Sequence, residues 1–269
     1  MQQSRTGVLA FIGRNTLGLI RYASGLGELS AATAYWAFVA PFQGRGLKGR
    51  NTLHQMVLTG YSAVPIVGLI SFFVGMVLAF QGAYQLEKIG ATYFVAALVG
   101  VSLTRELGPL ITAVVVAGRS GSAFAAEIGT MKVSEEIDAL NVMGLNAIKY
   151  LVVPKHLAMI VMMPCLTLLS DLAGILGGAS FGIVQLDQTL RMYVLATRDA
   201  LVMRDISTGL VKSVIFGSII TTVGCHEGFS VQGGAEGVGK ATTSSVVVSI
   251  FLVIVADLVF TAIFYYTGS

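Results

Sequence analysis

The chain contains five apolar segments that are each about as long as a bilayer is thick. A helix needs about 20 residues to cross the ~30 Å hydrocarbon core of a membrane. The five segments are Val57–Gln81, Tyr93–Ala117, Leu157–Val184, Ser207–Cys225 and Ser244–Tyr266. Inside a bilayer a helix satisfies its own backbone hydrogen bonds, which an isolated strand does not. We therefore expect an all-α, polytopic membrane protein with about five transmembrane helices.

Composition supports this class and excludes several others. Charged residues make up 12% of the chain, whereas soluble domains contain about 25%. The net charge of +3 is too small to indicate a nucleic-acid partner. Cys165 and Cys225 lie in apolar segments and predict neither a disulfide nor a metal site. The histidines are scattered and no catalytic motif is present, so we expect no metal, no cofactor and no enzyme active site.

The first 50 residues differ in character from the transmembrane domain expected over residues 51–269. Within residues 5–29, charged and apolar side chains each recur every seven residues on opposite helical faces. The charged ones are Arg14, Arg21 and Glu28, and the apolar ones are Ile12, Leu19 and Leu26. Such a helix lies in the membrane interface. The following apolar stretch, Ala31–Phe42, has only about half the spanning length, which predicts a re-entrant segment, with a sixth span as the alternative.

Basic residues predict the orientation of the spans. With five spans and a cytoplasmic N-terminus, eleven lysines and arginines flank the spans on the cytoplasmic side and four on the far side. The four are Lys88, Arg191, Arg198 and Arg204. Because cytoplasmic loops carry the excess of lysine and arginine, we expect the N-terminus inside and the C-terminus outside.

The longest polar insertion, about residues 119–155, lies on the cytoplasmic side in this topology. Between Glu127 and Gly144, acidic and apolar residues alternate with helical spacing and predict a short amphipathic helix. Its acidic residues are Glu127, Glu135, Glu136 and Asp138, and its apolar face contains Met131 and Met143. A helix of this kind seats in a groove on a partner protein. The alternative is a solvated surface helix.

Several charged residues lie inside the apolar segments, where an isolated charge is costly and therefore indicates a function or a partner. Arg105 and Glu106 lie at mid-depth, where they contact a lipid headgroup or pair with polar groups on neighbouring helices. Lys212 and Asp257 lie on consecutive segments, and we expect them to form an ion pair.

Two further patterns concern the first and third segments. A lipid-binding site needs an apolar cavity with a few polar groups. The outer end of the first segment offers Leu78, Gln81 and Tyr84, which we expect to contact lipid. On the third segment, glycines at every fourth position predict close helix contact, either within the chain or between two copies. These glycines are Gly174, Gly178 and Gly182.

The segment Gly234–Lys240 imitates a nucleotide-binding loop. It has the G-x-x-x-x-G-K spacing in which backbone amides and a lysine cradle phosphates. However, Ala241 occupies the position of the serine or threonine that would bind magnesium, and no strand precedes the segment. We therefore expect a flexible glycine-rich loop and no ATP site on this chain.

Five sequence blocks resemble the MlaE/YrbE permease family. They are Gly75–Gly82, Leu103–Pro109, Ala117–Ala123, Ala126–Met131 and Ala241–Thr243. The resemblance implies a permease in the inner membrane of a bacterial cell, which belongs to an ABC transporter. Such transporters move phospholipid or a related lipid between that membrane and a periplasmic MCE-domain protein, which helps to maintain the lipid asymmetry of the outer membrane.

The resemblance also implies a set of partners. These permeases form a homodimer with two copies of a cytoplasmic ATPase, often with a small STAS-domain subunit, so that ATP hydrolysis takes place on a separate subunit. By the same resemblance, the segment after Glu127 is the coupling helix that docks on the ATPase.

Two other function classes make different demands on the sequence. A secondary transporter of another hydrophobic substrate, which is the main alternative, needs inverted repeats with broken helices at corresponding positions. An intramembrane enzyme needs a convergent nucleophile or metal set. We find neither an internal repeat nor such a set in the sequence.

Overall fold

The computed structural model describes residues 2–40, 49–186 and 188–266, with the backbone alone for residues 2–15 and 19. All regular secondary structure in these ranges is helical, which confirms the expected all-α fold. Five stretches are long and apolar enough to cross a membrane: Gly49–Glu87, Thr92–Val133, Ile148–Gln185, Met203–Phe229 and Gly234–Tyr266. Each contains one of the five predicted segments, because the helices continue through polar residues beyond the apolar core.

The spans are built from helices that are in part interrupted. The first span consists of α2 (Gly49–Met56) and α3 (Val64–Glu87). The second consists of α4 (Val95–Ser102), α5 (Gly108–Val116) and α6 (Ser122–Val133). The third, fourth and fifth contain α8 (Val153–Gln185), α10 (Met203–Phe229) and α11 (Gly234–Tyr266). The helices outside the spans are α1 (Gln2–Ala34), α7 (Glu136–Val142) and α9 (Leu190–Ala200).

Wide, five-residue turns of the π type interrupt the helices shortly before three prolines. They are Val57–Tyr61 before Pro65, Leu103–Leu107 before Pro109, and Ile148–Val152 before Pro154. Proline lacks an N–H group and its ring collides with the carbonyl four residues earlier. The backbone adjusts to this with a wider turn, so the helix changes its register without ending.

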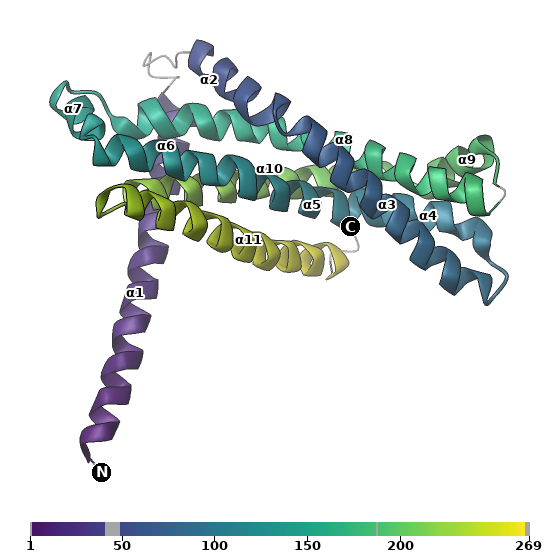
Figure 1. The fold of residues 1–269 in the computed structure, drawn as a ribbon, viewed down its shortest axis with the longest axis horizontal. Coiled ribbons are helices and arrows are strands. Elements are labelled where there is room, and N and C mark those ends of the chain that lie inside the picture. Colours follow the sequence, from purple (N-terminus) through teal and green to yellow (C-terminus); the bar gives the residue numbers. More distant parts are fainter. Residues whose placement is uncertain (1, 41–48, 187, 267–269) are drawn as a thin grey trace.

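The spans run side by side along the long axis of the molecule, and α7 lies at the opposite end from α9 (Figure 1). The helices α3 and α8 approach so closely that only glycine fits at the contact. A Cβ atom on Gly75 would lie 1.9 Å from the carbonyl oxygen of Gly174, and one on Gly177 would lie 1.9 Å from that of Phe72. The predicted glycine stripe therefore packs within the chain, because Gly178 and Gly182 also face the Tyr193 side chain.

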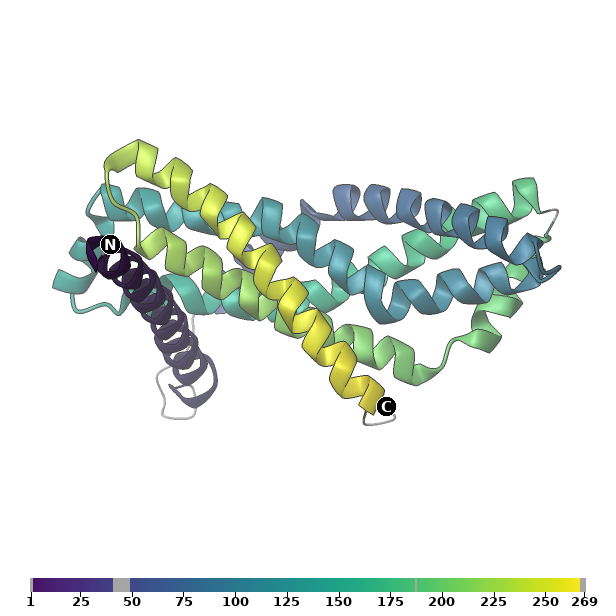
Figure 2. The same ribbon diagram turned by 90° about the horizontal axis from the view of Figure 1, so that it is seen from below.

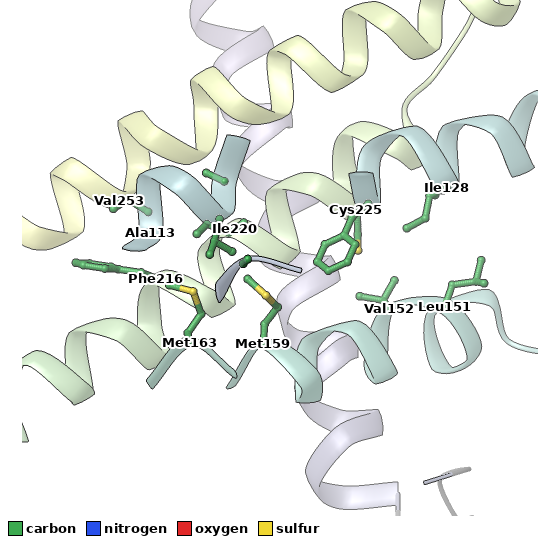
Figure 3. Packing of buried hydrophobic residues seen from close by; sticks show 14 of the residues in the cluster. Ala113, Ile128, Leu151, Val152, Met159, Met163, Phe216, Ile220, Cys225 and Val253 are labelled. Carbon is green, nitrogen blue, oxygen red and sulfur yellow. The ribbon is translucent and has the colours of Figure 1, made fainter. Parts of the chain in front are cut away.

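The largest apolar cluster lies where α10 crosses α8 and α6. Phe216 and Ile220 of α10 are fully buried against Met159 and Met163 of α8, with Ile128 of α6 at the other end of the cluster (Figure 3). Lipid tails are as apolar as these side chains, so the stability of this contact depends on tight packing and not on removal of water. By contrast, α11 crosses the bundle at a slant and leaves most of its surface uncovered (Figure 2).

The N-terminal helix α1 runs across the direction of the spans (Figure 1). Its C-terminal part packs on the bundle through Leu29 and Thr33, which are buried. The Tyr22 hydroxyl donates a 2.6 Å hydrogen bond to Glu227 Oε1, and the ring stands edge-on to His226 with centroids 5.0 Å apart. Burial and the Glu227 carboxylate raise the pKa of Tyr22.

The stretch Ala31–Phe42 continues this helix over its described part. Residues 31–34 belong to α1, and Tyr35–Val39 form another wide turn. Residues 41 and 42 lie outside the described residues. No sixth span is found within the ranges that the structure covers.

Two segments differ from expectation. The expected loop at Gly234–Lys240 is the first part of α11, where Lys240 pairs with Glu236 at 2.8 Å on the exposed surface. The stretch between the third and fourth spans contains α9, which the sequence analysis missed. Tyr193, Ala196 and Thr197 form the buried face of α9, at the spacing typical of an amphipathic helix. Burial raises the pKa of Tyr193 to about 12.

Candidate functional site

A cavity of about 720 Å³ lies between α3 and α8, at the end of the bundle near α9. We call it the outer cavity, after the side on which the charge distribution of the sequence predicts this end to lie. One wall is aromatic, and the ring centroids of Phe80 and Phe181 lie 4.4 Å apart. Polar groups of both helices complete the lining. The lining residues are Phe80, Gln81, Ala83, Tyr84, Gln85, Glu87, Phe181, Gln185 and Leu186. The cavity therefore joins apolar surface to several amide groups and one carboxylate, the combination that an amphipathic ligand requires.

The structure brings together only part of the predicted lipid-binding set. Gln81 and Tyr84 line this cavity. Leu78 does not line it and packs instead on the apolar cluster around Val95 and Val99. The ammonium group of Lys88, which the sequence analysis assigned to the far-side loop, lies 4.2 Å from the centre of the Tyr84 ring.

Arg105 and Glu106 are not part of the outer cavity. They lie in the wide turn before Pro109, and both face α10. Arg105 Nε is 3.5 Å from Asp205 Oδ1, at the start of α10. Glu106 forms an ion pair with Lys212, one of the largest fully buried side chains of the protein.

Lys212 is the centre of a cluster of polar side chains from three spans. Its Nζ atom donates hydrogen bonds to Asp257 Oδ1 at 2.9 Å and to Thr261 Oγ1 at 2.8 Å, in addition to the contact with Glu106. The Thr261 hydroxyl also lies 3.2 Å from Glu106 Oε2. The structure thus contains the expected Lys212–Asp257 contact within a larger group of two carboxylates, one ammonium and one hydroxyl.

The carboxylates of the cluster are partly exposed, whereas its lysine is buried. Lys212 is 1% exposed, whereas the side chains of Asp257 and Glu106 are 18% and 37% exposed. A charge in hydrocarbon is stable only when it is paired or hydrated. Two carboxylates on one lysine leave one negative charge in excess, and the exposed side of Glu106 gives it access to water or to a ligand.

The predicted coupling segment is divided into two helices. Glu127 and Met131 lie on α6, which continues the second span, and Glu127 accepts a 2.7 Å hydrogen bond from the buried ammonium of Lys155. The helical conformation is then interrupted at Glu135, whose φ of 59° lies in the left-handed region. Glu136 and Asp138 lie in the first turn of α7, where acidic residues stabilise the helix dipole.

The end of α7 presents apolar side chains to the surroundings. Val142 is 89% exposed and Met143 is 65% exposed, while Ile137 on the opposite face is buried. An exposed apolar end beside an acidic first turn is a surface that a partner protein can cover. Of the predicted coupling residues, Glu135, Glu136, Asp138 and Met143 are exposed around α7, and Glu127 and Met131 lie before the break.

Comparisons with known proteins agree with the resemblance found in the sequence. The sequence model of the family described as permease MlaE matches residues 52–263. A "Probable ABC transporter permease protein" of Rickettsia bellii is 39% identical over 256 residues, covering 94% of this chain and 96% of the relative. A protein of the same description from Synechocystis sp. is 41% identical over 222 residues, covering 82% of this chain and 83% of the relative.

A plant protein is similar over much of the same region. "Protein TRIGALACTOSYLDIACYLGLYCEROL 1, chloroplastic" of Arabidopsis thaliana is 38% identical over 225 residues, which cover 82% of this chain and 64% of that protein. The family match covers the five spans almost from end to end. The chain therefore belongs to the MlaE family and is a multi-pass membrane protein of the ABC transporter permease class.

Proposed function

We propose that the chain is the permease subunit of an ABC transporter that moves phospholipid or a related lipid. The outer cavity carries this proposal, because it offers aromatic surface for acyl chains beside amide groups that can bind a headgroup. The name of the Arabidopsis relative contains that of a glycerolipid, which supports a lipid substrate.

The proposed partners follow from the class of transporter. A cytoplasmic ATPase supplies the energy, since ABC permeases work with one. A second copy of this chain completes the transport path, and a periplasmic MCE-domain protein exchanges lipid with the outer end. A STAS-domain subunit completes the proposed assembly, which lies in a bacterial inner membrane and helps to keep the outer membrane asymmetric.

Lipid capture tests the outer cavity. A photo-crosslinking residue placed at Tyr84 or Gln81 is expected to capture phospholipid, because both positions line the cavity. Val184 is the matched control, since it lies near the same end of α8, is 72% exposed and does not line the cavity. Mass spectrometry of the crosslinked permease measures the bound lipid. Equal capture at Tyr84 and Val184 would mean that the lipid is only the surrounding bilayer.

Docking of the ATPase is proposed to occur at α7. Exchanging Glu135 and Glu136 for lysine is expected to abolish lipid-stimulated ATP hydrolysis while the permease remains folded, because both side chains are exposed. The exchange reverses the charge that the first turn of α7 presents. Glu28→Lys, an exposed charge reversal on α1, serves as the control. Co-purification of the ATPase is measured, and normal binding by the double variant would contradict the proposal.

A further inference from the structure

A second polar pocket lies at the other end of the bundle. It has a volume of about 370 Å³ and is lined by α2, the middle of α6, the turn Ile148–Val152 and the start of α8. Its lining residues are Arg50, Asn51, His54, Gln55, Glu127, Tyr150, Leu151, Pro154 and Lys155. Most of them are polar, and none contributes to the outer cavity.

One face of α2 is directed to this pocket without a protein partner. Arg50, Asn51, His54 and Gln55 lie on two successive turns of the helix and all line the pocket. Among the described residues, no side-chain hydrogen bond or ion pair involves these four side chains. A row of four unpaired polar groups on one helical face is available to a ligand.

The charges of the pocket favour an anion. Lys155 is buried, with its ammonium held by Glu127 at 2.7 Å and 5.5 Å from the centre of the Phe124 ring. This pair is neutral as a whole, so the guanidinium of Arg50 leaves one positive charge in excess. Arginine binds phosphate through two parallel N–H groups, and the neighbouring amide and imidazole groups supply further donors.

The surroundings of the pocket favour a lipid over a soluble anion. Leu53 and Val57 continue along the same span and are 63% and 60% exposed, so an apolar surface leads away from the pocket. Near the pocket, the Lys149 ammonium lies 5.2 Å from the centre of the Trp36 ring. Basic and aromatic residues of this kind mark the headgroup level of a membrane.

We propose that this pocket binds the phosphate of a phospholipid headgroup from the leaflet at this end of the bundle. Arg50 binds the phosphate, the amides of Asn51 and Gln55 orient it, and the acyl chains follow the exposed apolar side chains of α2. The proposal rests on the proposed lipid transport, and it adds a site in the leaflet opposite to the outer cavity. The permease then has one lipid site at each end of its spans.

The test uses the full-length permease with a photo-crosslinking residue at Leu53 and dihexanoyl phosphatidylglycerol as the probe. Wild-type pockets are expected to capture the probe. Arg50→Gln is expected to lower capture at least about tenfold, because the loss of even one charge-assisted hydrogen bond has that effect. Arg50→Lys, which keeps the charge, is expected to lower it less. Arg191→Gln, an exposed arginine at the opposite end, is expected to change nothing.

Three outcomes would overturn the proposal. Capture that is unaffected by Arg50→Gln removes the role of the guanidinium. Equal capture of dihexanoylglycerol, which lacks phosphate, reduces the contact to apolar surface. Displacement of the probe by an equimolar amount of inorganic phosphate assigns the pocket to a soluble anion, because a lipid site must prefer the ligand that also contacts its apolar surface. Capture at Tyr84 in the outer cavity is measured in parallel, so failure at Leu53 alone leaves the proposed transport function intact.

Discussion

Replacing Lys212 with methionine is expected to destabilise the permease by about 3 kcal/mol, the cost of leaving buried charges without their partner. Lys212 is the one cation that pairs with both Glu106 and Asp257 within this cluster. Without it, two carboxylates face each other in a region of low dielectric. Partial exposure of Glu106 lets water hydrate one of them, which keeps the cost at the lower end of the range for buried pairs.

Replacing a carboxylate of the cluster is expected to cost less stability than replacing its lysine. In Asp257→Asn the lysine keeps its ion pair with Glu106, and the amide oxygen still accepts a hydrogen bond, so the loss is about 1 kcal/mol. Adding Glu106→Gln and Asp257→Asn to Lys212→Met should recover much of the stability, because no unpaired charge remains. Thermal unfolding in detergent measures all variants, with the exposed Lys240→Met as control. Equal destabilisation by Lys212→Met and Asp257→Asn would contradict the prediction, because the cation would then contribute no more to stability than one of its carboxylate partners.

Gly75→Ala is expected to be strongly destabilising even though alanine favours helices. The new Cβ atom would lie 1.9 Å from the Gly174 carbonyl oxygen, which is backbone and has no rotamer by which to move away. The helices α3 and α8 would have to separate, and overpacking of this kind costs about 1–3 kcal/mol or more. Loss of the contact also disrupts the outer cavity, because the same two helices line it.

Gly68→Ala provides the control on the same helix. A Cβ atom on Gly68 meets only Leu169 Cδ2, at 3.7 Å, which is an ordinary contact. This variant should be neutral or more stable by up to about 1 kcal/mol, the helix-propensity gain of alanine over glycine. The melting temperature and the yield of folded permease distinguish the two variants. If Gly75→Ala melts at the temperature of Gly68→Ala, then the close approach of α3 and α8 does not limit stability.

The sequence predicts the five spans well because length and apolarity are sufficient to define a transmembrane helix. It predicts their ends less well. The helix α11 begins at Gly234, ten residues before the apolar segment. Glycines and polar residues outside the hydrocarbon core can extend a helix, because the turns that follow are already formed. The helix α9 was missed because it is only 11 residues long, too short to span a bilayer, and only Tyr193 and its neighbours on one face are buried.

The contacts of the polar sites could be predicted where the free-energy cost of an isolated buried charge determines them. The cost of isolated charges predicts that Lys212 and Asp257 meet, and they do so at 2.9 Å. That Glu106 joins them depends on the wide turn at Leu103–Leu107, which residue polarity does not indicate. For the same reason, the sequence grouped Arg105 and Glu106 with Gln81 and Tyr84, whereas the structure places the two pairs in different regions.

Because of the wide turns, the number of residues in the second span affects which of its side chains face the neighbouring helices. Each π-type turn holds one residue more than a regular helix, and each residue of an α-helix turns the chain by about 100°. Two such turns, Leu103–Leu107 and Ala117–Gly121, connect α4, α5 and α6. Deleting one residue at Ala117–Gly121, which no proline follows within the helix, would leave a continuous helix but rotate everything on one side of the deletion. The number of residues in this span, and not only their polarity, therefore decides which side chains face α10.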